Sequence, residues 1–258
     1  MKQPWILVGA IFLIGCAGAV RPAQSHRNSD ALLVLPGFGY DRAAQESFET
    51  AAQALSAEGI DLYVPDYLRR SGFKDTREAF LQFYDREKLS DYERLHIFAF
   101  IAGAWTFNPS LDKRPFENLS TVIYDRSPLQ ERAPRLATEE LHFPTWLLFG
   151  QLVFQMADSA YQPIDAGKRF KVGSMVETQP TALIERYRET ALSYGTVDFS
   201  CDQLNQSHDD CIFVPLNHDE MYTRFSELLP EILHIIREGK FRAEANRQPP
   251  ANIEQSAP

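Results

Sequence analysis

Short apolar runs alternate with longer amphipathic stretches along most of the chain. Each run has the length of a buried β-strand, and each stretch has the three-to-four-residue spacing of a helix face. Strands that alternate with helices predict an α/β fold, a mostly parallel sheet with helices on both faces, whose functional site lies at the carboxyl ends of the strands. The predicted strands fall at 31–35, 61–65, 95–100, 120–124, 169–173 and 211–215.

The predicted helices have start and stop signals. The first has a candidate N-cap at Asp41 and ends at Gly59, and the last ends at Gly239. Apolar positions at helical spacing predict helices around 48–55, 80–84, 183–191 and 221–236.

One segment departs from the alternation. "LHFPTWLLFGQLVFQM" (141–156) follows the fourth strand and is apolar almost throughout. It predicts either a core helix, which we favour, or a hydrophobic cap over a pocket.

The bulk composition fits one large domain, which we place at 31–242. Of the 258 residues, 44% are hydrophobic and 24% are charged, so the chain can bury a substantial core. The formal net charge is -9 at pH 7, whereas nucleic-acid binding needs lysines and arginines clustered on one face. The charge therefore argues against a nucleic-acid partner.

The first residues predict export. "MKQPWILVGAIFLIGCAGAV" places Lys2 before an apolar segment, 5–15, and then Cys16. This segment is shorter than the ~20 residues that a transmembrane helix needs. "LIGC" resembles the lipobox of bacterial lipoproteins, in which cleavage leaves the cysteine as the first residue of the mature protein, carrying acyl chains.

This resemblance implies a signal at 1–16 and a membrane anchor at Cys16. Because Ala17 follows the cysteine, the lipoprotein sorting rule implies the outer membrane, with the domain facing the periplasm. The alternative is an ordinary signal peptide, cleaved near 17–19. We expect a polar tether at 17–30 and a disordered tail at 243–258, because both are polar and aperiodic.

The two other cysteines are Cys201 and Cys211, which flank a polar loop. A disulfide between them would close that loop and would fit an oxidising compartment. Two buried free thiols are the alternative.

Three motifs follow the ends of predicted strands. "LPGFGY" (35–40) has two glycines that let the backbone approach a ligand, "FAFIAG" (98–103) follows the third strand, and "VPLNHDEMY" (214–222) follows the last. In this order they resemble motifs of the α/β hydrolases, particularly the lipase- and esterase-like members, over most of residues 31–240.

The resemblance implies a nucleophile where this chain has none. The nucleophile elbow of that family is G-x-S-x-G, and its three fixed positions fall on Ala99, Ile101 and Gly103. The elbow is a strained turn, and a β-branched residue at positive φ is an outlier, so Ile101 indicates that the turn has relaxed. We therefore expect the serine chemistry to be lost.

The other parts of that family's site have candidates here. His218 matches the catalytic base, and the acid falls either on Glu177, after the fifth strand, or on Asp125, after the fourth. The backbone N–H groups of Phe38 and Ala102 match the oxyanion donors. Taken singly, each carboxylate fits the surface better than a catalytic site, and His218 fits a helix-capping residue as well as a base.

Other chemistry fits the sequence less well. Ser127 follows the fourth strand, but Ser71 and Ser174 lack a strand, turn and helix with flanking glycines. "SHDDC" and "NHDE" are rich in metal-ligand types without a helical pair of histidines. We expect no metal and no cofactor.

The sequence thus predicts an exported, lipid-anchored protein with an α/β-hydrolase-like fold. We expect it to bind an apolar small molecule, an acyl compound or an envelope protein partner. The first alternative is an active ester or lipid hydrolase that uses His218 with an unrecognised nucleophile. A structural envelope protein without a pocket is the second.

Overall fold

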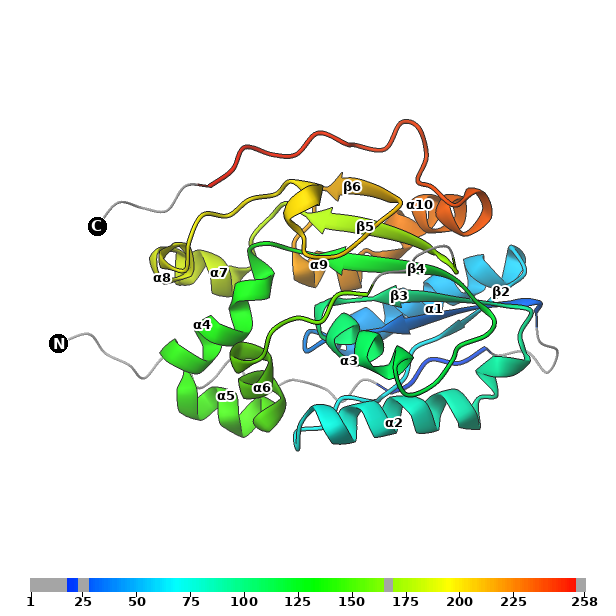
Figure 1. The fold of residues 1–258 in the computed structure, drawn as a ribbon, viewed down its shortest axis with the longest axis horizontal. Helices are drawn as coiled ribbons and strands as arrows, with labels where there is room; N and C mark the ends of the chain where they lie inside the picture. The colour runs from blue at the N-terminus through cyan, green and yellow to red at the C-terminus, as the bar shows by residue number, and fades with distance from the viewer. Residues whose placement is uncertain (1–17, 23–27, 165–168, 254–258) are drawn as a thin grey trace.

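The centre of the protein is a parallel sheet with the strand order β2-β1-β3-β4-β5-β6 (Figure 1). The structure is a computed structural model that describes residues 18–22, 28–164 and 169–253. The predicted mostly parallel sheet is confirmed. The strands are β1 (Asp30–Leu35), β2 (Ile60–Tyr63), β3 (Arg94–Ala99), β4 (Leu119–Arg126), β5 (Lys171–Glu177) and β6 (Asp210–Val214).

Helices cover both faces of this sheet, as predicted. On one face α1 (Arg42–Ala57) and α10 (Phe225–Glu238) pack over a core that includes Phe48 and Phe225. On the other face α2 (Phe73–Arg86) and α3 (Ile101–Leu111) enclose a second core. The sheet is therefore buried on both sides, which explains why its strands are apolar runs and do not alternate with polar residues.

The predicted helix signals are present, although two predicted helices are each broken into two. Asp41 caps α1 by accepting a hydrogen bond from the backbone N–H of Ala44, and Gly239 ends α10 with φ 73°. A one-residue break at Arg224 separates α10 from α9 (His218–Thr223), and α7 (Ala182–Arg186) is likewise separated from α8 (Arg188–Ser193). An apolar face continues across such a break, so the periodicity does not reveal it.

The apolar segment 141–156 is not a core helix. It forms part of a cap, which was the alternative prediction. It forms α5 (His142–Phe149) and α6 (Gln151–Asp158), which Gly150 joins at φ 63°. With α4 (Ala133–Glu140) they form a cap beside the arrowheads of β4 and β5 (Figure 1). Phe143 is 68% exposed and Trp146 49%, because α5 lies on the outside of this cap.

The two ends of the described chain lie along the edges of the sheet. Val20 exchanges two backbone hydrogen bonds with Val64, just after edge strand β2. At the other edge the N–H of Phe213 in β6 donates to the carbonyl of Asn246, over 2.8 Å. Edge strands offer unpaired backbone groups, and these fix segments whose polar composition predicts disorder.

These contacts involve the described parts of two segments with predicted boundaries. The expected tether 17–30 is docked on the domain at the described residues 18–22, and the expected disordered tail 243–258 is docked as far as residue 253. Cys16, the signal at 1–16 and residues 254–258 lie outside the described residues.

No described helix has the length and apolar character needed to cross a membrane.

The strand order contains one reversal, between β1 and β3. The chain passes from β1 to β2 on one side and then returns to place β3 on the other side of β1. The loops that leave β1 and β3 therefore diverge, and in open α/β sheets ligands bind in the crevice that such a divergence opens.

Candidate functional site

A cavity of about 220 Å³ lies at this crevice, beneath the cap. The loop after β1 contributes Phe38, and the first turn of α3 contributes Ile101 and Ala102. The cap and the start of α7 supply a mostly apolar wall. That wall includes Ala137, Phe149, Val153, Met156 and Leu183, and the polar side chains at the cavity are Gln130, Thr181, His218 and Asp219.

His218 reaches this cavity from the first position of α9. Asn217 before it forms a capping box, in which its side chain accepts from the N–H of Glu220 and the Glu220 side chain accepts from the N–H of Asn217. The ring of His218 also lies edge-on to Tyr222, with centroids 5.2 Å apart. The capping box and the ring contact fix the direction in which the imidazole points.

Behind the imidazole lie both candidate acids, not one of them. Nδ1 of His218 is 2.6 Å from Oε1 of Glu177 and 3.3 Å from Oδ2 of Asp125. Both carboxylates are fully buried. The surface position that the sequence favours for each carboxylate taken singly is therefore wrong. They converge because they stand near the carboxyl ends of neighbouring strands β4 and β5, on the face that α9 covers.

Burial and close approach determine the protonation of this group. Burial and the neighbouring Asp125 carboxylate raise the pKa of Glu177 well above its usual value, as expected when two carboxylates share one site. Burial alone would lower the pKa of His218, but the charge of Glu177 and the contacts with both carboxylates outweigh it and raise this pKa to about 10. At neutral pH the imidazole of His218 is therefore protonated, and the raised pKa means that Glu177 holds a proton more tightly than a free glutamate does.

Ile101 stands where the elbow nucleophile would stand. It is the first residue of α3, immediately after β3 and Phe100. Gly103 supports this alignment, because a Cβ at that position would lie 2.3 Å from the carbonyl oxygen of Leu35 in β1. Only glycine allows this approach of helix to strand, which is the role of the last glycine in an elbow.

The strained conformation of an elbow is absent at Ile101. Within the described residues, positive φ outside glycine occurs only at Lys88 and Asn205. Ile101 instead begins a regular helix. The prediction that the turn has relaxed is consistent with this geometry.

Two buried tyrosines hold the loop that carries Phe38. The hydroxyl of Tyr222 accepts from the N–H of Gly37 over 2.6 Å, and the hydroxyl of Tyr67 donates to the carbonyl of Pro36 over 2.6 Å. Neither tyrosine was identified from the sequence, although Tyr222 follows His218 by one helical turn and so shares its face.

The candidate oxyanion donors are left free by this arrangement. No described residue accepts a hydrogen bond from the backbone N–H of Phe38 or Ala102, and both residues line the cavity. Ala102 lies in the first turn of α3, where backbone N–H groups have no partner within the helix. The geometry thus preserves hydrogen-bond donors at the cavity while the nucleophile is missing.

The alternative nucleophiles do not line this cavity. The hydroxyl of Ser127 accepts from the N–H of Gln130, and that of Ser174 is buried inside β5. Ser71 is exposed before α2. The one hydroxyl side chain on the cavity wall, among the parts of the chain described here, is Thr181, which donates to Gln130 over 2.8 Å.

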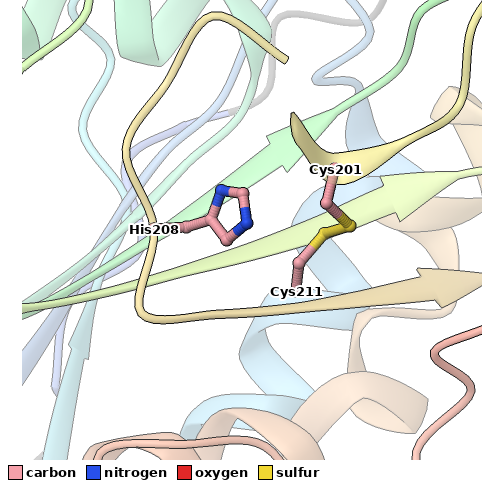
Figure 2. A group of neighbouring side chains, drawn as sticks. All are labelled: Cys201, His208 and Cys211. Atoms are coloured by element: carbon pink, nitrogen blue, oxygen red, sulfur yellow. A yellow bond between two sulfur atoms is a disulfide. The ribbon is translucent and has the colours of Figure 1, made fainter. Parts of the chain in front are cut away.

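Two groups of side chains have the composition of metal ligands. Cys201, His208 and Cys211 lie together, but the two sulfur atoms are joined in a disulfide (Figure 2), so neither is available as a thiolate. Of the two predictions for Cys201 and Cys211, the structure has the disulfide and not the two free thiols. In the other group, the donor atoms of Asp125, Glu177 and His218 lie within 4.8 Å of one another. A cation there would have to replace the short contact between His218 and Glu177.

Comparison with known proteins identifies the fold. No protein-family model matches the chain, and no curated protein matches it by sequence. Est1E from Butyrivibrio proteoclasticus is similar in structure with a TM-score of 0.52 and 12% identity, over 84% of this chain and 92% of that one. MGS-MChE2, an alpha/beta hydrolase enzyme from the metagenome of lagoon sediments at Mar Chica, Morocco, gives 0.51 and 10%, over 84% and 92%. The chain has the α/β-hydrolase fold, and similarity at this level of identity establishes the fold alone.

The geometry at Ile101 predicts that restoring a serine does not restore hydrolysis. In Ile101→Ser the hydroxyl would lie in the first turn of a regular helix, beside an imidazole that already carries its proton. We expect ester hydrolysis by this variant to equal that of the matched Ile101→Ala variant. Hydrolysis of a short p-nitrophenyl ester and labelling by a fluorophosphonate probe measure it. A labelled Ser at this position would contradict the assignment.

The protonation of the buried group predicts a dependence of stability on pH. The folded pKa of His218 is about 10, above the ~6.5 of a free histidine, and the pKa of Glu177 is raised too. The folded state therefore keeps protons that the unfolded chain releases. For His218 the stability falls as pH rises from about 6.5 to about 10, and for Glu177 the fall begins above the usual glutamate value of 4.5. The slope is at most ~1.4 kcal/mol per pH unit for each retained proton.

Urea denaturation at a series of pH values measures this slope. The matched variant is Glu177→Gln, which keeps nearly the same shape and removes the carboxyl group whose charge raises the pKa of His218. It is expected to flatten the slope. Equal slopes in the two proteins would show that the pair does not retain the protons.

Proposed function

We propose that this protein binds a small apolar molecule, such as a short acyl compound, in the cavity beneath the cap, and does not hydrolyse it. The observation that carries the proposal is Ile101, an apolar side chain on the cavity wall at the place of the nucleophile. The cavity of about 220 Å³ is smaller than the ~300–1,000 Å³ of typical drug-sized sites. It therefore fits a small ligand better than a protein segment from an envelope partner.

Magnitudes favour binding over the alternative of an ester or lipid hydrolase. In serine hydrolases, loss of the nucleophile alone lowers turnover by about a millionfold. A general base must also accept a proton at the working pH, and the pKa of His218, about 10, leaves it protonated there. Acyl transfer by this site would thus lack both a nucleophile and a general base, whereas the pocket and its hydrogen-bond donors remain.

Filling the cavity with a larger side chain is expected to weaken ligand binding. Val153 lines the cavity and is buried on α6, so Val153→Trp would occupy the space of the ligand and weaken binding by at least about tenfold, or ~1.4 kcal/mol. Gln151→Trp is the matched control, because it adds the same side chain to an exposed position of the same helix. Calorimetric titration with hexanoate, hexanamide and hexan-1-ol measures the affinities.

The outcome separates the proposed functions. Binding that is retained in Gln151→Trp and lost in Val153→Trp supports a ligand in this cavity. Turnover of an ester by the unchanged protein would support the hydrolase instead. The absence of binding across butanoate to decanoate and their amides and alcohols would overturn the proposal.

We also propose that the protein is exported and attached to the outer membrane through acylated Cys16, facing the periplasm. The lipobox-like "LIGC" before the domain supports the anchor. The disulfide between Cys201 and Cys211 supports export, because disulfides persist in oxidising compartments. Two acyl chains on one residue suffice for stable attachment, since each buried methylene adds about 0.8 kcal/mol.

Metabolic labelling with a palmitate analogue in a bacterial host tests the anchor. The unchanged chain is expected to be labelled and Cys16→Ser to lose the label completely. A variant with Cys201→Ala and Cys211→Ala is the control and should keep it. An unlabelled mature protein that begins near residues 17–19 would show an ordinary signal peptide instead.

A further inference from the structure

We propose that the ligand is a carboxylate with a short apolar tail, and that the imidazole of His218 binds its head group. This inference rests on the proposed binding function and specifies the chemistry of the ligand. It comes from three features of the cavity: the free edge of one imidazole, the donors around it and the distribution of polar groups along the wall.

The imidazole presents one free donor to the cavity. Nδ1 faces Glu177 and Asp125, so Nε2 lies on the opposite side of the ring. None of the described residues makes a hydrogen bond with Nε2, although the side chain of His218 is more than nine-tenths buried. Because His218 lines the cavity, a ligand in the cavity can accept a hydrogen bond from Nε2.

The charge behind the ring determines what this donor prefers. The carboxyl groups of Glu177 and Asp125 both lie on the Nδ1 side of the protonated imidazole. The positively charged ring therefore presents its free N–H to the cavity. An anionic acceptor gains more from a charged donor than a neutral acceptor does.

The surrounding donors suit the same head group. The unpartnered N–H groups of Phe38 and Ala102 lie at the cavity, and Ala102 stands at the positive end of the α3 dipole. Asp219 is the other titratable residue on the wall. Because Asp219 is exposed, solvent screens its charge more than that of the buried group.

The rest of the wall suits an apolar tail. Val153, Met156 and Leu183 provide hydrocarbon surface. The hydroxyl of Thr181 and the side chain of Gln130 are already hydrogen-bonded to each other. A second carboxylate on the ligand would find no cationic side chain besides His218 among the described lining residues, so we infer a monocarboxylate.

A series of ligands of equal length tests the head group without changing the protein. The full-length chain is titrated calorimetrically at neutral pH with hexanoate, hexanamide and hexan-1-amine. We expect hexanoate to bind at least about tenfold more tightly than hexanamide, because hydrogen bonds to charged groups are stronger than those between neutral groups. The amine should not bind.

A charge-removing variant tests the origin of that preference. Asp125→Asn combined with Glu177→Gln replaces both acids by amides of the same shape, so nothing remains to hold the proton on His218. Hexanoate should lose its advantage, and hexanamide should bind as before.

The possible results distinguish failure of the head-group inference from failure of the proposed binding function. If hexanamide binds as tightly as hexanoate to the unchanged protein, or more tightly, the head-group inference is wrong and the binding function stands. If the preference for hexanoate survives in the double variant, His218 is not its source and the inference is again wrong. If none of the compounds binds, from butanoate to decanoate, both the inference and the binding function fail.

Discussion

The contact of one imidazole with two buried carboxylates is the constraint on which the site depends. His218 lies within 2.6 Å of Glu177 and 3.3 Å of Asp125, and neither acid reaches solvent. Two buried negative charges beside one positive charge would be costly. The raised pKa values of His218 and Glu177 reflect this cost, because both groups hold their protons more tightly than free side chains do, and the imidazole stays charged at neutral pH. A hydrolytic base would need the opposite state, a neutral imidazole.

Ile101 argues against hydrolysis independently of the charge on His218. An isoleucine that begins a regular helix provides neither a nucleophile nor the strained turn that would present one. Gly103 nevertheless keeps α3 against β1, and Tyr222 still holds the loop beside it. The parts that shape a cavity and supply donors are therefore present around an apolar residue at the elbow position, as the proposed binding function requires.

Much of this could be predicted from the sequence because it is encoded locally. The strand and helix alternation gives the fold, and His218 is placed by the strand and cap that precede it. The joint use of Asp125 and Glu177 could not be predicted, because it depends on how two strands pair. Nor could the docking of residues 243–253, because their partners are backbone groups of an edge strand. The sequence left 141–156 open between a core helix and a cap, because an apolar composition does not distinguish a core helix from one that covers a cavity.

The protonation of His218 is the most direct test of the account. Nitrogen-15 chemical shifts of its ring, assigned by comparison with a His218→Gln variant, report whether each nitrogen carries a proton. At neutral pH the account predicts that both nitrogens are protonated, with titration only near pH 10. A ring with one unprotonated nitrogen at neutral pH would contradict it, because His218 would then be a neutral base of the kind that hydrolysis requires.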